Sequence, residues 1–493
     1  LALSSSIIMA SNVTEFYNGK TVFLTGGTGF VGVCLIEKLL RCMPDLKNIY
    51  VFNRLKEENK TNLFNKLIPI AGDVGEENLG LSSADRLTLV EDVNIVFHSA
   101  ATLDFEADLK SNTNINLLGT RRVVQLCQEI RDLKALVHVS SAYVNSVLTE
   151  VDEQVYPAPY DVNELIALVE KLDIETLKQE TPSILKDHPN SYTFTKHLAE
   201  HEVKNGGIPA AIVRPSMITA SWKEPIPGWT VSKNGIQGFL MGASKGVIRR
   251  LPVVKDIIYD YIPVDLVVNN LIVAAYAVNQ DRYGKLKVYH CTSGTRNPFK
   301  WANIEPKINY YLHKYPLQSA VWYPYLKLLP SIFMFRLSAI FVHLIPGYIL
   351  DIVAKLTGGR PILVRLHTNV NNSLDRLKTF IFTEWKFYNP RTIDLHDSLS
   401  EIDKNLFNLD IKPLIWESYF IDLTQGVRQY LNNESPKSLE KARSKDKILL
   451  VAHIGLQAVL LGLVWWLVKT IFATSWTAAG LVVPITYLLF DEL

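Results

Sequence analysis

Tyr192 and Lys196 stand four residues apart in the sequence YTFTK. On a helix, side chains at i and i+4 lie on one face, so the phenol and the ammonium would point the same way. A free tyrosine titrates at about 10, and a neighbouring lysine favours the phenolate and lowers that pKa. Such a tyrosine could donate a proton to a developing alkoxide during hydride transfer. The same spacing also arises by chance on surface helices, so its meaning depends on the residues around it.

Other polar side chains that suit this chemistry follow short apolar runs. Ser140 and Ser141 end the run LVHVSS, and either hydroxyl could hydrogen-bond a substrate oxygen. Asn116, in INLLGT, places an amide on an expected helix between two strands. Pro215 and Ser216 follow a later apolar run, where backbone could meet a nicotinamide ring. With the tyrosine and the lysine, these residues predict a hydride-transfer site.

A glycine-rich sequence near the start of the chain predicts where a dinucleotide binds. The sequence TVFLTGGTGFVG places Gly26, Gly29 and Gly32 between an apolar run and a helical pattern. The first glycine permits a tight turn, the second lets backbone N–H groups approach a pyrophosphate, and the third lets the helix pack close to the sheet. The phosphates would then lie at a helix N-terminus, where free N–H groups and the helix dipole favour an anion.

The end of the second apolar run indicates which dinucleotide is bound. An NAD enzyme usually has an acid there for the ribose 2′-hydroxyl, whereas this chain has Asn53 and Arg54. Arg54 could pair with a 2′-phosphate, so NADPH is favoured; alternatively it is a solvent-exposed arginine. Asp73, in the sequence GDV after the third run, could accept a hydrogen bond from the adenine amine.

The predicted catalytic and cofactor-binding residues can meet only if a sheet brings the ends of their strands together. Short β-rich runs alternate with helical patterns, which predicts an α/β fold with a doubly wound, parallel, Rossmann-type sheet. The helical pattern Val33–Arg41 follows the first run, and a mainly helical region begins after about residue 300. The expected strands are Thr21–Leu24, Ile49–Phe52, Leu67–Ile70, Ile95–His98, Leu136–Val139, Ala210–Val213 and Leu286–His290.

Composition excludes several classes of protein. The 493 residues include 51 Lys+Arg and 49 Asp+Glu, a net charge of +2, which argues against a nucleic-acid partner. Four cysteines without a CxxC pair exclude a zinc ribbon, and no metal site is expected.

Residues 1–10 lack the positive region of a signal peptide, so we expect the catalytic part to face the cytosol.

The C-terminal region predicts a transmembrane anchor. The run 448–468 carries no formal charge and has the length of one bilayer crossing, and a second apolar run fills 471–490. A basic cluster at 437–447 puts the preceding domain on the cytoplasmic side. A pair of buried core helices is the alternative. A weaker apolar stretch, 331–350, is interrupted by Arg336, His343 and Pro346. We expect it to be interfacial or to line an apolar groove, with a spanning helix as the alternative.

The motifs occur in an order that resembles the extended short-chain dehydrogenase/reductases. They are TGGTGFVG, GDV, FHSAAT, HVSSAYVN, YTFTK and IVRPS. More narrowly, VRPSMITASWKEPIPGW, YIPVDLVVN, HCTSGTRNP, TEWKFYN and LFNLDIKPLIWESYF are similar to the fatty acyl-CoA reductases, especially those of insects. The resemblance covers about residues 18–432.

The resemblance implies reduction of a long-chain acyl-CoA to a primary alcohol with two NADPH, through a bound aldehyde and with release of CoA. It assigns catalysis to Ser141, Tyr192 and Lys196, where Ser141 takes the place of the family's usual threonine or serine. Motifs and resemblance together predict these cofactor-binding residues: Gly26, Thr28, Gly29, Phe30, Gly32, Arg54, Asp73, Val74, Ala100, Asn116, Tyr192, Lys196, Pro215 and Ser216.

The implied organisation has five parts. Residues 1–17 are an extension, 18–298 the NADP-binding domain, 299–432 a helical C-terminal domain, 433–447 a basic linker and 448–490 the membrane segment. The expected membrane is that of the endoplasmic reticulum, with the peroxisome as the alternative.

One segment departs from the family pattern. Residues 55–67 are fewer than the family normally has there, so the crossover would need a minimal helix from Lys56 to Leu67. The short crossover leaves open a non-catalytic, membrane-tethered NADPH-binding protein. A second alternative keeps the fold but changes the chemistry: a sterol or sugar-nucleotide dehydrogenase/epimerase of the same superfamily.

Overall fold

The computed structural model describes residues 11–52, 65–104, 107–281, 285–471, 475–480 and 484. The chain folds into two compact units that interleave along the sequence. The first consists of Leu1–Pro227, Ile258–Phe299 and Glu384–Ile415, and the second of Gly228–Ile257, Lys300–Thr383 and Trp416–Leu493. Segment 384–415 thus folds with the first unit, and the limits expected from the sequence stay a prediction.

A seven-stranded parallel sheet forms the first unit, with the order β11-β7-β5-β4-β1-β2-β3. Chain order reverses between β1 and β4, as in a doubly wound fold, so the predicted fold class is confirmed. Every run expected to be a strand is one. The strands are β1 (Thr21–Thr25), β2 (Asn48–Phe52), β3 (Leu67–Ile70), β4 (Ile95–His98), β5 (Ala135–Val139), β7 (Ala210–Pro215) and β11 (Lys287–Cys291).

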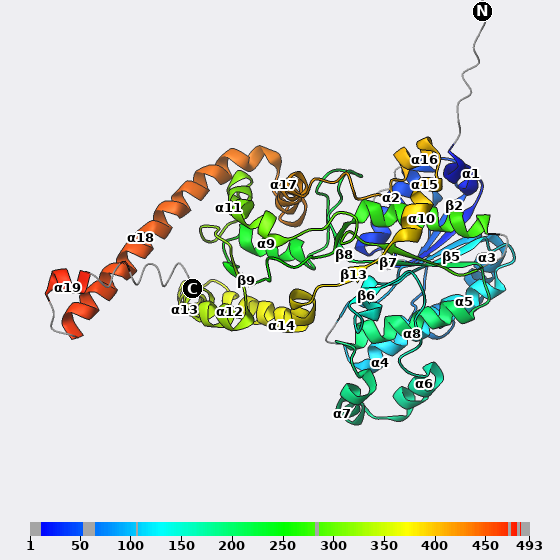
Figure 1. The fold of residues 1–493 in the computed structure, drawn as a ribbon, viewed down its shortest axis with the longest axis horizontal. Helices are drawn as coiled ribbons and strands as arrows, with labels where there is room; N and C mark the ends of the chain where they lie inside the picture. The colour runs from blue at the N-terminus through cyan, green and yellow to red at the C-terminus, as the bar shows by residue number, and fades with distance from the viewer. Residues whose placement is uncertain are drawn as a thin grey trace, which may run out of the picture. The chain divides into compact units, whose positions relative to one another are not determined.

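Helices cover both faces of this sheet, so its central strands are buried on both sides and read as continuous apolar runs. In Figure 1, α2 (Phe30–Cys42) and α10 (Val264–Gln280) lie on one face, and α5 (Gly119–Glu129) and α8 (Ser191–Asn205) lie on the other. One core joins strand side chains such as Phe23 and Leu136 to Val123 and Leu126 of α5, all fully buried.

Shorter elements complete the first unit. The helices are α1 (Asn12–Tyr17), η2 (Glu77–Gly80), α3 (Ser83–Asp92), α4 (Leu109–Asn112), the π-helix η3 (Thr113–Leu118), η4 (Ala142–Asn145), α6 (Val162–Lys171), α7 (Ile174–Leu185), α15 (Pro390–Ser398) and α16 (Glu401–Leu406). Two parallel strand pairs join β8 (Met217–Thr219) to β10 (Tyr261–Pro263) and β6 (Glu150–Val151) to β13 (Lys386–Phe387).

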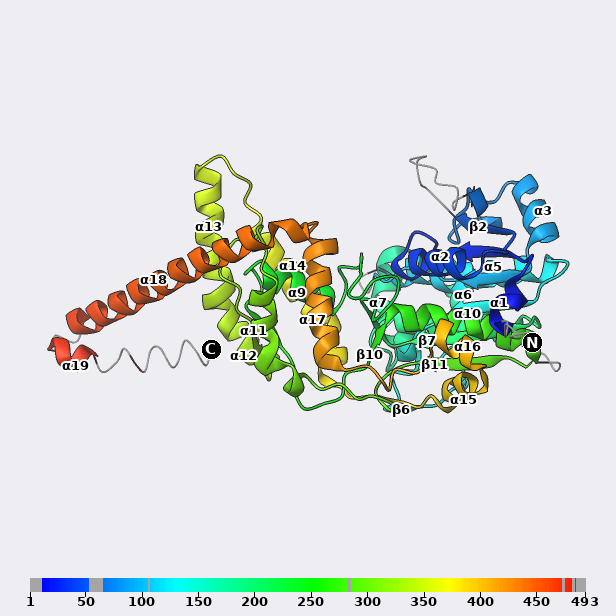
Figure 2. The ribbon, with the colours of Figure 1, turned by 90° about the horizontal axis from the view of Figure 1, so that it is seen from above.

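The second unit is mainly helical, as the sequence predicts for the C-terminal region, and one strand pair joins β9 (Arg250–Pro252) to β12 (Lys327–Leu329). Figure 2 shows α13 and α18 as separate projections of this unit. The helices are α9 (Ile236–Ser244), η5 (Trp301–Asn303), α11 (Glu305–Lys314), α12 (Ile332–Ala339), the π-helix η6 (Ile340–Leu344), α13 (Ile345–Leu356), α14 (Leu363–Phe382), α17 (Trp416–Gly426), the π-helix η7 (Val427–Leu431), η8 (Pro436–Ser438), α18 (Leu439–Ile471) and α19 (Trp476–Gly480).

Two helical segments are long and apolar enough to cross a membrane. In Ile332–Leu356, the most apolar stretch of 18 residues has a mean hydropathy of 1.9, and 22% of it is buried. In Pro436–Ile471, the corresponding stretch has a mean hydropathy of 2.2, and 0% of it is buried. The second segment contains the predicted anchor run 448–468, so it could serve as a membrane anchor. The other expected run, 471–490, lies mostly outside the described residues.

Candidate active site

The glycine-rich turn between β1 and α2 is held by close backbone contacts. Gly26 has φ +77°, and a Cβ on it would lie 2.7 Å from the Ala100 backbone nitrogen. A Cβ on Gly32 would lie 2.2 Å from the Gly26 carbonyl oxygen, so only glycine lets α2 start this close to β1. At Gly29, by contrast, an added Cβ would meet only the Gly26 carbonyl oxygen, at 3.3 Å.

The N-terminus of α2 is open as a dinucleotide site requires. Gly29 is its N-cap residue and, within the described chain, no side chain caps the helix. Thr28 and Gly29 are exposed, and Phe30, the first helical residue, is half-buried. The amides of the first turn can therefore bind a phosphate, where the helix dipole also favours an anion. These residues fit a dinucleotide pyrophosphate.

Two of the predicted catalytic residues meet beyond the end of β5. Ser141 leaves the strand and begins η4, where its hydroxyl accepts a hydrogen bond from the Tyr143 amide at 3.2 Å. Its side chain also hydrogen-bonds the Tyr192 phenol. Tyr192 lies in the first turn of α8, which begins there because Asn190 caps it by accepting from the Thr193 amide.

Lys196 lies one turn further along α8 and reaches the same strand. Its ammonium donates to the Val139 carbonyl oxygen at 2.6 Å, and its Nζ lies 3.5 Å from Nε2 of the buried His138. Burial lowers the pKa of Lys196 to about 8. The carbonyl end of β5 thus gathers the serine, the tyrosine and the lysine that the sequence predicts to act together.

The pKa of Tyr192 departs from the expectation. We expected the neighbouring lysine to lower it, but burial raises it to about 12, and the Ser141 hydrogen bond only partly opposes the rise. The reason is that the i, i+4 spacing fixes the direction of both side chains and says nothing about desolvation. The phenol therefore keeps its proton at neutral pH, which suits an acid that protonates an alkoxide.

Asn116 links the cofactor side of the site to α8. Its amide oxygen accepts from the Thr102 amide at 3.0 Å, and its nitrogen donates to Asn112 at 3.0 Å and to Thr195 at 3.3 Å. It lies in the π-helical segment η3, a rare distortion that is frequent at functional sites. The predicted amide on the intervening helix thus holds the residue next to Lys196.

The remaining predicted residues are placed as follows. The Asp73 carboxylate accepts from the Gly75 amide at 2.8 Å, and Val74 is buried in the core beside the sheet. Pro215 ends β7, and the Ser216 amide donates to the Cys291 carbonyl oxygen at 3.1 Å. Arg54 and most of the expected helix from Lys56 to Leu67 lie outside the described residues.

A buried ion pair behind the site was missed by sequence reasoning. The Arg214 guanidinium binds both Glu200 carboxylate oxygens at 2.8 and 2.6 Å, and both side chains are fully buried. Ser140 donates to the same carboxylate at 2.5 Å. Burial opposes charge at Glu200, yet Arg214 holds the pKa of Glu200 below its usual value. Ser140 thus ties β5 to α8, which leaves Ser141 for the site.

The motif TEWKFYN packs on the turn that carries Ser141. Trp385 and Phe387 place their rings edge-on against Tyr143, with centroids 5.4 and 5.3 Å away. The Trp385 indole N–H also donates to the Ser146 carbonyl oxygen at 3.2 Å. Trp385, 239 residues after Ser146, thereby fixes η4. The sequence marked TEWKFYN as aromatic and as a family motif, but nothing in it indicated this contact.

We expect Trp385→Leu to lower turnover roughly ten- to a hundredfold, because a displaced η4 turn misplaces the Ser141 hydroxyl. Trp385→Phe keeps an aromatic ring against Tyr143 and should retain most activity. Steady-state kinetics on both variants, with NADPH binding as a separate readout, would measure this. Full turnover in Trp385→Leu would show that the motif does not position the serine.

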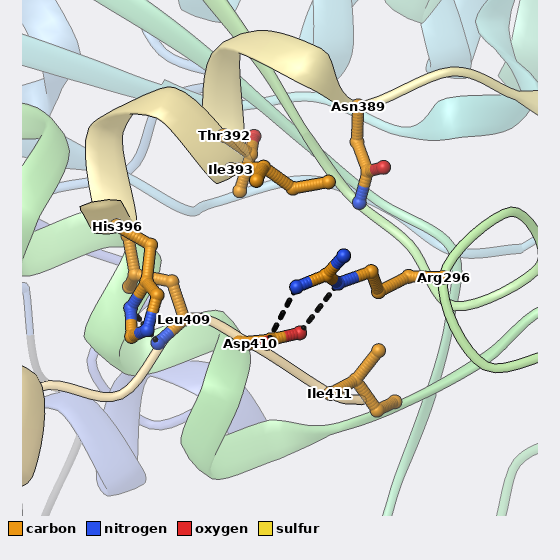
Figure 3. A pocket seen from close by; sticks show the side chains of 8 residues that line it. All are labelled: Arg296, Asn389, Thr392, Ile393, His396, Leu409, Asp410 and Ile411. Atoms are coloured by element: carbon orange, nitrogen blue, oxygen red, sulfur yellow. Dashed lines mark hydrogen bonds and ion pairs between the residues drawn. The ribbon is translucent and has the colours of Figure 1, made fainter. Parts of the chain in front are cut away.

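A small cavity lies elsewhere in the first unit (Figure 3). Arg296 binds Asp410 through two bonds of 2.9 Å, and the neighbouring wall includes Asn389, Thr392 and His396. Its volume of about 10 Å³ holds roughly one water molecule. It is therefore too small for a dinucleotide or an acyl chain.

The sheet order, the glycine turn and the serine–tyrosine–lysine set define an NAD(P)-binding oxidoreductase of the short-chain dehydrogenase/reductase class. Two family models described as "Male sterility protein" match residues 24–271 and 342–434. The structure also resembles the terminal R domain of the myxalamid PKS-NRPS pathway, with a TM-score of 0.55, 20% identity, and coverage of 86% of this chain and 92% of that one, which supports the fold.

Two relatives span nearly the whole chain. "Putative fatty acyl-CoA reductase CG8306" of Drosophila melanogaster is 54% identical, over 98% of this chain and 100% of its own length. "Fatty acyl-CoA reductase 1" of Rattus norvegicus is 33% identical, over 92% and 93%. The chain belongs to the fatty acyl-CoA reductase family.

Proposed function

We propose that the protein reduces a long-chain fatty acyl-CoA to a primary alcohol with two NADPH, through a bound aldehyde and with release of CoA. The observation that carries this proposal is the hydrogen bond between Ser141 and Tyr192 at the end of β5, with Lys196 on the same helix. Membership of the family supports the acyl substrate.

The side chains have complementary roles in each reduction. Bound NADPH supplies the hydride. Ser141 and Tyr192 donate hydrogen bonds to the substrate carbonyl oxygen and stabilise the negative charge that develops on it. With a pKa of about 12, the Tyr192 phenol stays protonated until that charge forms and then transfers its proton.

The same site serves both steps. In the first, the thioester carbonyl gains a hydride and a proton; the carbon–sulfur bond then breaks and CoA leaves as the thiol. In the second, the aldehyde gains a hydride and a proton and becomes the alcohol. The Lys196 ammonium, oriented by the Val139 carbonyl oxygen, stabilises the tyrosinate left after each transfer until a proton returns.

We expect Arg54→Asp to lower kcat/KM with NADPH roughly tenfold or more, as the loss of one charge-assisted hydrogen bond to the 2′-phosphate requires. The value with NADH should change little. Arg54→Lys keeps the charge and serves as the matched control. If the ratio of the two cofactors is the same in Arg54→Asp as in the original chain, another residue recognises the phosphate.

The long apolar helix α18 suits an enzyme whose substrate partitions into lipid. We propose that α18 anchors the protein with its catalytic unit facing the cytosol, because Lys441, Arg443, Lys445 and Lys447 precede the apolar run on the same helix. The endoplasmic reticulum is the proposed compartment, with the peroxisome as the alternative.

Substrate panels separate the proposal from its competitors. Membranes that contain the protein are supplied with NADPH and either acyl-CoAs of different chain lengths or sterols. NADPH consumption that depends on a long-chain acyl-CoA and yields an alcohol supports the proposal. Sterol-dependent consumption would indicate a sterol-type dehydrogenase, and NADPH binding without turnover of any substrate would indicate a non-catalytic protein.

A further inference from the structure

One side of α13 is apolar and exposed. Its large side chains recur at helical spacing, so they form a single face. Their exposure ranges from 46% at Ile345 to 81% at Leu356. The six side chains of this α13 face are Ile345, Tyr348, Ile349, Ile352, Val353 and Leu356. A continuous patch of this kind on a protein surface marks an interaction site.

The opposite side of α13 packs on α14, which leaves the α13 face outward. Gly347 is the buried residue of α13, and a Cβ on it would lie 3.4 Å from Cδ2 of His367. The His367 ring stacks on His343 at a centroid distance of 4.8 Å. The helix is thus seated on α14 through its small residue.

The hairpin between α13 and α14 is fixed at its tip. The Asp351 carboxylate accepts hydrogen bonds from the amides of Ile362, Leu363 and Val364, at 2.9, 3.0 and 2.9 Å. These amides open α14, so the carboxylate caps the second helix from the first. The α13 face is therefore presented by a structured hairpin.

Charge at the tip indicates the partner. Lys355, Arg360 and Arg365 are exposed around the turn, beside the most exposed apolar side chain, Leu356. An apolar helix face next to cations complements a bilayer surface with anionic headgroups. A second protein chain would need matching acidic groups instead.

The exposed apolar helix α18, in the same unit, also indicates a bilayer as the partner. Arg249 donates its amide hydrogen to Nε2 of His343 at 3.0 Å, and its guanidinium lies 3.4 Å from Nε2 of His453 on α18. Arg249 thus contacts both η6, which leads into α13, and the apolar part of α18. The inference rests on the proposed anchor: with the exposed, apolar α18 in the bilayer, this contact brings the start of α13 to the membrane.

We propose that the α13 face inserts into the membrane surface as an interfacial element that does not cross the bilayer. The whole helical segment Ile332–Leu356 is long enough to cross, but its first part is packed in the unit through α12 and η6. The remaining part, α13, has 12 residues and is about 18 Å long, less than the roughly 30 Å hydrocarbon core. The preceding helix α12 is held in the unit on one side by the buried Phe335, Ser338 and Ala339, while Phe333 and Leu337 on its other side are 74% and 38% exposed. The returning helix α14 carries three asparagines at 369–372 in its middle.

Depth-dependent quenching of a fluorescent label tests this in the full chain. The cysteine background is Cys42→Ser, because the other three cysteines are buried. A polarity-sensitive fluorophore is attached to Ile352→Cys, or to Asn372→Cys on the exposed side of α14 as the matched control. The proteins are reconstituted in phosphatidylcholine and phosphatidylserine vesicles that carry a quencher at either a shallow or a deep acyl position.

We expect the label at 352 to be quenched more strongly by the shallow quencher than by the deep one, and the label at 372 by neither. Adding Ile349→Asp to the labelled chain should reduce quenching at 352 several-fold. Stronger quenching by the deep quencher would instead indicate a crossing. Equal, weak quenching at both sites, or protection of 352 by cross-linking to a second copy, would overturn the proposal.

Discussion

Replacing Tyr192 with phenylalanine is expected to lower alcohol formation by about 10²–10⁴, the usual contribution of a general acid. The change removes only the hydroxyl that Ser141 binds, and the buried ring keeps its packing. NADPH binding should therefore stay near that of the original chain. Single-turnover assays with acyl-CoA and a fluorescence titration with NADPH measure the two effects separately.

Tyr50→Phe is the matched control for this substitution. Its hydroxyl bonds Asp92 at 3.1 Å, outside the catalytic set, so turnover should change little. Near-normal turnover in Tyr192→Phe would mean that another group supplies the proton.

Replacing Arg214 with methionine is expected to destabilise the first unit by about 3–5 kcal/mol, because the Glu200 carboxylate would stay fully buried without its cation. The loss should appear as faster proteolysis in urea. Glu200→Leu combined with Arg214→Met removes both charges and should recover most of the stability.

The exposed ion pair Arg86–Glu129 serves as the control for the buried pair Arg214–Glu200. Arg86→Met should cost about 1 kcal/mol or less, because water solvates the remaining carboxylate. Equal effects of Arg86→Met and Arg214→Met would show that burial does not determine the contribution of the ion pair.

The sheet and the glycine turn were predictable because local physics determines them. Buried parallel strands such as Ile95–His98 read as short apolar runs, and the turn needs glycine because a Cβ on Gly32 would strike the Gly26 carbonyl. Ser141, Tyr192 and Lys196 could be placed together because the ends of β5 and the start of α8 meet at one edge of a parallel sheet.

The features that could not be predicted from the sequence depend on burial or on contacts between distant segments. The pKa of Tyr192 rises because the ring is buried, and a spacing of four residues does not reveal desolvation. The Glu200–Arg214 pair joins a helix to a strand, so neither residue shows its partner in a local pattern. Trp385 supports the Ser141 turn from a distant segment, and only folding brings them together.

Isotope transfer from NADPH deuterated at the transferable position tests the central claim most directly. If one site delivers both hydrides to the same carbon, long-chain acyl-CoA will yield an alcohol with two deuterium atoms at C1, while Tyr192→Phe yields almost none. An alcohol with a single deuterium, or an aldehyde released as the final product, would contradict the account.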